Sequence, residues 1–176
     1  MTMLVSGLTA LMVTIAAIVD PDLAQAGKSA YLVSGVVMCL VDLGVALGIA
    51  AVAAATPIAL GRLRTPIVVL TVAASLAMVV AEAALRVDFA TGTAAYGVVG
   101  PLQALGLIAM GVGIVRAGRW TSWRRFAVLA WGLYVPLVMV PLLAASGGTS
   151  LVALGGYHLG VVAAAWALWS ELRHDS

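Results

Sequence analysis

Residues 30–54 read AYLVSGVVMCLVDLGVALGIAAVAA, and the only charged side chain among them is Asp42. A helix needs about 20 mostly apolar residues to cross ~30 Å of hydrocarbon, because it rises about 1.5 Å per residue. This stretch is long enough to do so. It therefore predicts a transmembrane helix that carries one acid near its middle.

Five further segments meet the same requirement, and the connections between them are too short to hold a soluble domain. The six predicted spans cover residues 2–19, 30–54, 66–85, 95–115, 126–145 and 151–169. We therefore expect an all-α fold, a polytopic membrane helix bundle of six transmembrane helices that forms a single domain over residues 1–176. The first segment resembles the core of a signal peptide, with Ala-Gln-Ala at residues 24–26. Because it lacks a charged start, we interpret it as a retained helix.

The composition of the 176 residues agrees with this fold class. Apolar residues make up 64% and charged residues 9% of the chain, whereas soluble domains have about 25% charged residues. So few charges exclude a soluble globular fold. The only cysteine is Cys39, which excludes an intrachain disulfide and a multi-cysteine metal site. The GxSxG, P-loop, HExxH and CxxC motifs are absent, and we expect neither a metal nor a cofactor.

The basic residues predict the orientation of the spans. With the N-terminus in the cytoplasm, seven arginines lie on the cytoplasmic side and only Lys28 and Arg86 lie outside, in agreement with the positive-inside rule. The seven are Arg62, Arg64, Arg116, Arg119, Arg124, Arg125 and Arg173. Both termini are then cytoplasmic. We expect a multi-pass protein of the cell membrane, and the preference for arginine over lysine favours a bacterial inner membrane.

Residues 116–125 read RAGRWTSWRR and combine arginine with tryptophan. Arginine supplies charge and tryptophan prefers the membrane interface, so this loop favours contact with anionic membrane lipids. The loop is short and has no glycine-rich phosphate cradle. We therefore expect no nucleic-acid partner.

Small residues and prolines predict how the helices pack. Gly44 with Gly48, and Gly156 with Gly160, form two GxxxG pairs that allow close backbone approach. We interpret both as contacts within the bundle, and a homo-oligomer or a membrane partner is the alternative. Pro136 in the fifth span removes a backbone donor and predicts a kink.

Two carboxylates lie within the spans, where a charge costs about 2.5–3.5 kcal/mol. Asp42 is too deep for its short side chain to reach water, so it must face protein or a wet cavity, or carry a proton. Glu82 has Arg86 four residues later, and we expect an ion pair near the membrane boundary. The third span also carries a polar stripe at helical spacing that should face the bundle: Thr71, Ser75, Met78 and Glu82.

Further polar side chains lie at a similar depth. His158 in the sixth span is interpreted as a neutral hydrogen-bonding group between helices, with a proton carrier as the alternative. Gln103 lies in the fourth span with Tyr96 on the same face, and Tyr134 lies midway along the fifth. One shared pocket and a set of separate interhelical hydrogen bonds are both compatible with this common depth.

An acid held among apolar side chains suits isomerisation or cyclisation, which moves protons and needs no cofactor. We therefore hypothesise an intramembrane acid/base isomerase or cyclase, or a binding protein, for an isoprenoid- or lipid-like molecule. The candidate catalytic residues are Asp42, Glu82 and His158, and the candidate substrate-binding residues are Gln103, Tyr134, Tyr157, Tyr96 and Ser75. Two alternatives stay open: a proton-coupled transporter or channel, and a noncatalytic subunit of a membrane complex.

Overall fold

The computed structural model of the chain describes residues 1–20, 29–146 and 150–174. All regular structure in these residues is helical, and six of the described helical segments are long and apolar enough to cross a membrane. The predicted all-α class and the six apolar spans are thus confirmed. Lys28 and the Ala-Gln-Ala triplet at residues 24–26 lie outside the described residues.

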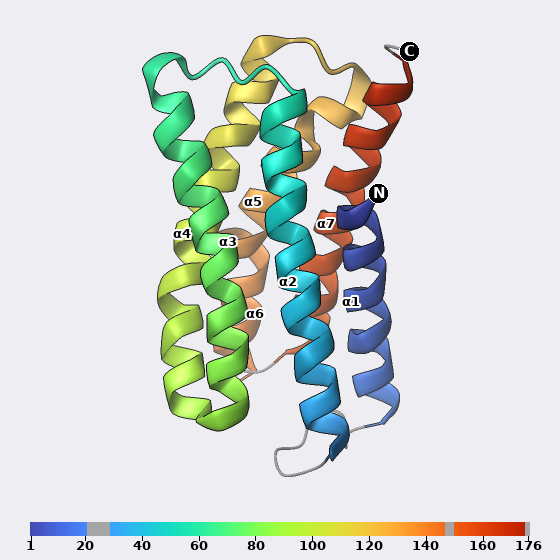
Figure 1. The fold of residues 1–176 in the computed structure, drawn as a ribbon, viewed down its shortest axis with the longest axis vertical. Coiled ribbons are helices and arrows are strands. Elements are labelled where there is room, and N and C mark those ends of the chain that lie inside the picture. The colour runs from blue at the N-terminus through green and yellow to red at the C-terminus, as the bar shows by residue number, and fades with distance from the viewer. Residues whose placement is uncertain (21–28, 147–149, 175–176) are drawn as a thin grey trace.

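The six spans form two layers of three (Figure 1). The first layer contains α1 (Thr2–Val19), α2 (Ser29–Ala55) and α3 (Arg64–Val87), and the second contains α4 (Phe89–Ala117), the irregular fifth span and α7 (Leu151–His174). Each span packs on its neighbours along the chain, and α7 packs back on α1. The bundle is therefore a closed ring. The turns η2 (Gly61–Leu63) and η3 (Ser122–Phe126) lie at the end of the bundle where α7 ends (Figure 1).

The fifth span is divided by a wide turn. It consists of α5 (Ala127–Tyr134), the π-helical segment η4 (Val135–Met139) and α6 (Val140–Ala145). Pro136 lies in the π-helical segment, where a widened turn accommodates a residue that has no N–H to donate. A π-helical turn thus lies at the proline for which the sequence predicts a kink. Trp131 and Val135 are buried, whereas no residue of α6 is.

The fourth span begins earlier than the apolar pattern predicts, because Asp88 caps it. The Asp88 carboxylate accepts hydrogen bonds from the backbone N–H groups of Ala90, at 3.3 Å, and Thr91, at 3.2 Å. The Thr91 hydroxyl also donates to it. These bonds, led by that of the Thr91 hydroxyl, hold the pKa of Asp88 below its usual value. Capping of this kind satisfies N–H groups that have no partner within the helix, so α4 starts at Phe89.

Both GxxxG pairs pack against other helices of the same chain. A side chain at Gly44 would collide with Ser6 of α1, and one at Gly48 would collide with Met3. On α7, Gly156 lies against Tyr134 of the fifth span and Gly160 lies against Trp131. The predicted contacts within the bundle are therefore confirmed. Binding of a second copy or of another protein by these faces stays a prediction.

The outer surface of the ring is apolar on every span. Large apolar side chains are exposed on α1, α2, α3, α4, the fifth span and α7, for example Val5, Leu40, Val80, Leu105, Leu137 and Val152. Such continuous apolar exposure is rare on soluble proteins. The six hydrophobic helices therefore indicate a multi-pass membrane protein.

We expect Gly44→Val to destabilise the bundle by about 1–3 kcal/mol, because the added methyl groups would overpack the interface with α1. Thermal unfolding of the purified protein in detergent measures the change. Gly97→Val is the matched control, since a Cβ atom added at Gly97 has no neighbour within 4 Å. Equal unfolding temperatures for the two variants would contradict the packing described here.

Candidate functional site

Glu82 forms a buried ion pair that joins three helices. Its side chain accepts a hydrogen bond from the Arg86 guanidinium through Oε1, and one from the Tyr96 hydroxyl, at 2.7 Å, through Oε2. The Arg86 guanidinium also lies over the ring of Tyr31 of α2, with 4.1 Å to the ring centroid. Gly35 of α2 leaves room for the arginine, because a side chain there would meet Arg86 Cδ at 2.8 Å. The predicted Glu82–Arg86 pair is confirmed.

Asp42 is not part of this pair, although it interacts electrostatically with Glu82. It is in the middle of α2, since Ser29 and Ala55 at the two ends are each 13 residues away, or about 20 Å along the helix. Its Oδ2 atom is buried and has no hydrogen-bond partner among the described residues. Asp42 is close enough to Glu82, Tyr96 and Tyr157 to interact with them electrostatically.

A chain of hydrogen bonds connects α7, α4 and α3 near Asp42. The Tyr157 hydroxyl donates to Gln103 Oε1 at 2.8 Å, and Gln103 Nε2 donates to Ser75 Oγ at 2.9 Å. The Ser75 hydroxyl then donates to the backbone carbonyl of Thr71 at 2.8 Å. Every hydroxyl proton in this chain is used, so the Tyr157 oxygen can only accept further hydrogen bonds. The chain thus presents an acceptor at its Tyr157 end.

We call Asp42, Glu82, Tyr96, Ser75, Gln103 and Tyr157 the polar centre. Its members come from α2, α3, α4 and α7, and all of them were expected from the sequence. Ser75 and Glu82 are buried, as the predicted polar stripe of the third span requires, and Gln103 of α4 is buried as well. Asp42, Tyr96 and Tyr157 are each half-buried. The polar centre therefore lies at the interface of the two layers without being sealed on every side.

His158 and Tyr134 make their hydrogen bonds elsewhere. His158 is buried between α7 and α1, with Nδ1 3.1 Å from Thr14 Oγ1. Because the Thr14 hydroxyl donates its proton to the Ala10 carbonyl at 2.9 Å, the imidazole Nδ1–H is the donor to Thr14. The Tyr134 hydroxyl donates to the Ala153 carbonyl at 3.0 Å. Both residues thus connect neighbouring helices, and their hydrogen bonds involve neither of the two carboxylates.

Sequence reasoning missed two of these partners, Thr14 and Tyr31. Thr14 belongs to a row of small or polar residues at helical spacing on the first span, Ser6, Gly7, Ala10 and Thr14, all of which are buried. That row is the signal that could have located the partner of His158. Nothing in the sequence pairs Tyr31 with Arg86, because their contact depends on how α2 is rotated against α3.

The described residues contain no cluster of three or more His, Cys, Asp or Glu that could hold a metal ion. Two cavities lie toward the end of the bundle where α2 ends, and neither is lined by a member of the polar centre. The polar centre itself offers one unpartnered carboxylate oxygen, one fixed ion pair and one hydroxyl acceptor. Such a set can bind a polar group and exchange a proton with it.

Comparison of the chain with protein-family models, with curated proteins and with solved structures found no match.

We expect Gln103→Leu and Tyr157→Phe to be energetically coupled, because each removes one partner of the same buried hydrogen bond. A double-mutant cycle on unfolding free energies in detergent should give a coupling of about 0.5–1.5 kcal/mol. The control cycle pairs Gln103→Leu with Tyr134→Phe, whose hydroxyl bonds the Ala153 carbonyl instead, and should be additive. Additivity in both cycles would contradict the Tyr157–Gln103 bond.

Proposed function

We propose that the chain is a multi-pass membrane protein with both termini in the cytoplasm. Most of the arginines lie at one end of the bundle. Arg62, Arg119 and Arg124 belong to the turns at the end where α7 ends, and Arg64 begins α3 at the same end. Arg116 and Arg173 lie in the last turns of α4 and α7 (Figure 1). Arg86 is in the last turn of α3, at the opposite end. The positive-inside rule assigns the arginine-rich end to the cytoplasm.

The orientation predicts which loop a membrane-impermeant thiol reagent reaches. In a Cys39→Ser background, Ser146→Cys should react in intact cells, whereas Ser122→Cys should react only after the membrane is opened. Both serines are exposed and lie at opposite ends of the bundle, so they form a matched pair. The reverse pattern of labelling would overturn the proposed orientation.

For the activity, we propose that the polar centre binds the polar group of a lipophilic molecule and transfers protons on it, as an acid/base isomerase or cyclase does. The observation that carries this proposal is the buried Asp42 Oδ2 atom, which has no hydrogen-bond partner among the described residues. An unsatisfied buried oxygen costs about 1–3 kcal/mol. A polar group of a ligand would satisfy this oxygen, and the Tyr157 hydroxyl, which interacts electrostatically with Asp42, offers a second acceptor.

The hydrogen bonds assign different roles to the candidate catalytic residues. Both oxygens of Glu82 are occupied by Arg86 and Tyr96, and the imidazole of His158 is bonded to Thr14. We therefore assign proton transfer to Asp42, with Glu82 as the fixed charge beside it. Isomerisation of a double bond adds a proton at one carbon and removes one from another. A single carboxyl that gives one proton and takes one returns to its starting state, so no further reactant is needed.

Asp42→Asn is expected to lower the turnover by at least about 100-fold, since it keeps the shape of the side chain but removes the transferable proton. The assay compares lipid extracts of cells that express the wild type, the variant or no protein, by chromatography coupled to mass spectrometry. Isomerisation or cyclisation predicts pairs of species of equal mass and different retention. Leu43→Ala, at the neighbouring exposed position, is the control for expression and folding.

An isomer profile that is the same in wild-type cells, in the Asp42→Asn variant and in cells without the protein would reject the enzyme. Reconstituted vesicles then separate the remaining candidates. A proton flux that Asp42→Asn abolishes would identify a transporter or channel, and a stoichiometric partner that copurifies from native membranes would identify a subunit of a complex.

A further inference from the structure

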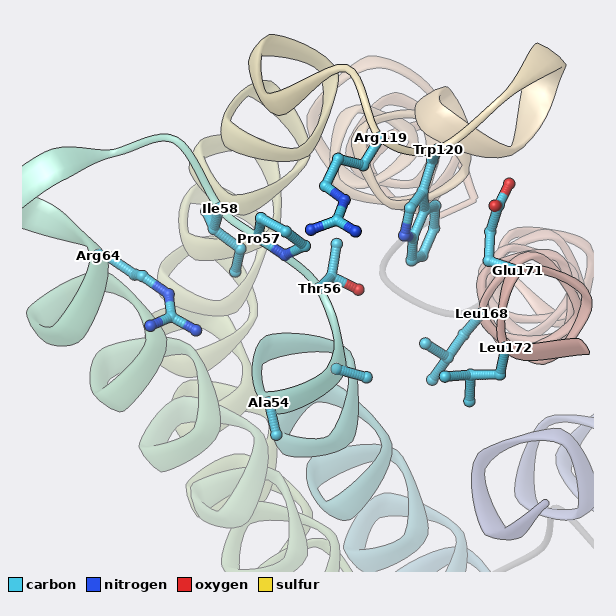
Figure 2. A pocket seen from close by; sticks show the side chains of 11 residues that line it. Ala54, Thr56, Pro57, Ile58, Arg64, Arg119, Trp120, Leu168, Glu171 and Leu172 are labelled. Atoms are coloured by element: carbon cyan, nitrogen blue, oxygen red, sulfur yellow. The ribbon is translucent and has the colours of Figure 1, made fainter. Parts of the chain in front are cut away.

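A cavity of about 500 Å³ lies at the arginine-rich end of the bundle, away from the polar centre (Figure 2). Its walls are the end of α2, the turn at residues 56–58, the turn at Arg119 and Trp120, and the last part of α7. A backbone hydrogen bond and a packing contact fix the position of the turn at residues 56–58. Ala59 N–H donates to the Gly113 carbonyl at 3.0 Å, and Ile58 is buried against Gly113.

The polar groups in this cavity are mainly donors. Thr56 is 3% exposed, and its hydroxyl has no hydrogen-bond partner among the described residues. In Figure 2 the Arg119 guanidinium extends over Thr56, and the Arg64 side chain reaches from α3 toward the end of α2. Arg64 Nη2 donates to the Ala53 carbonyl at 2.8 Å, which compensates one of the free carbonyls at the end of α2. Arg119 makes no ion pair with any described residue.

The one acid that lines the cavity is already neutralised. Glu171 Oε1 accepts a hydrogen bond from Thr121 N–H at 3.1 Å and lies 3.2 Å from Arg124 Nε. Figure 2 shows its carboxylate directed away from Thr56. The field inside the cavity is therefore set by two arginines, which favours an anion.

An apolar groove adjoins the cavity. A second, smaller cavity of about 120 Å³ lies between α1, α2 and α7, and it shares the side chains of Leu168 and Leu172 with the first. It exists because α1 has 18 residues and α2 has 27, so the start of α1 leaves the end of α2 uncovered (Figure 1). Its other walls include Met3, Leu47 and Ala51. A charged cavity that continues into an apolar groove matches an amphiphile with an anionic head.

We propose that this end of the bundle is a binding site for an anionic phospholipid of the surrounding leaflet. The lipid phosphate accepts hydrogen bonds from Arg119, Arg64 and the Thr56 hydroxyl, and one acyl chain follows the groove along Leu168 and Leu172. This site is independent of the chemistry proposed for the polar centre. It requires that the bundle lies in a membrane, with this end at the level of the headgroups.

The test measures the unfolding temperature of the purified full chain in an uncharged detergent, as a function of added lipid. Phosphatidylglycerol should stabilise the wild type at lower concentrations than phosphatidylcholine with the same acyl chains. Arg119→Gln should weaken the apparent affinity for phosphatidylglycerol roughly five-fold, the effect of one charge near a membrane surface, and Thr56→Val should weaken it in the same direction. Arg116→Gln removes the same charge at the same end but does not line the cavity, and should leave the affinity unchanged.

Three results would overturn the proposal. Equal stabilisation by the two lipids would show that the charge of the headgroup is not recognised. Stabilisation by inorganic phosphate alone, as strong as that by phosphatidylglycerol, would show that the site takes a soluble phosphate compound. Equal losses for Arg119→Gln and Arg116→Gln would show attraction by the whole arginine-rich end. Because Arg119 is exposed, its variant should unfold at the wild-type temperature without lipid, so the comparison does not depend on whether Thr56→Val folds.

Discussion

The structure depends on close contact between helix backbones. In hydrocarbon the apolar side chains of a helix are as well solvated by lipid as by another helix, so dispersion contacts and interhelical hydrogen bonds must hold the bundle together. Each pair of neighbouring spans in the ring accordingly meets at a glycine where an added Cβ atom would come closer than 3.0 Å to an atom of the other span. These glycines are Gly7, Gly35, Gly44, Gly106, Gly111 and Gly156.

The same close contact makes the polar centre possible. At Gly106 the two helices α3 and α4 approach so closely that a side chain there would collide with Thr71. One turn away, the short side chain of Ser75 is within 2.9 Å of the Gln103 amide. A serine hydroxyl reaches a neighbouring helix only where the backbones are near. The packing glycines and the hydrogen-bond chain to Tyr157 are thus two results of one interface.

Much of the fold follows from the sequence, because length and hydropathy decide where a span lies in the chain. The six apolar segments, the Glu82–Arg86 pair and the irregular turn at Pro136 are all local features, which depend on residues a few positions apart. The start of α4 was misplaced because the cap at Asp88 stands outside the apolar pattern. Asp88 followed by a helix-forming segment is nevertheless a local signal of a helix start.

The sequence predicts which residues belong to the candidate site, but not how they are arranged in space. The rotation of each helix about its axis decides that Asp42 lies near Glu82 and that His158 binds Thr14. The sequence indicates only how deep each residue lies in its span. Tyr157 and His158 illustrate this limit. They are adjacent in the chain, but about 100° of helical rotation separates their side chains, so one reaches Gln103 of α4 and the other reaches Thr14 of α1.

The π-helical segment at Val135–Met139 changes the angular phase of the fifth span. An extra residue in one turn sets every later side chain back by about 100° relative to an uninterrupted α-helix. Before the segment the span turns Trp131 into the protein, and after it no side chain of α6 is buried. The span thus changes, at a single proline-containing turn, from a helix with a buried face to a short helix with no buried residue.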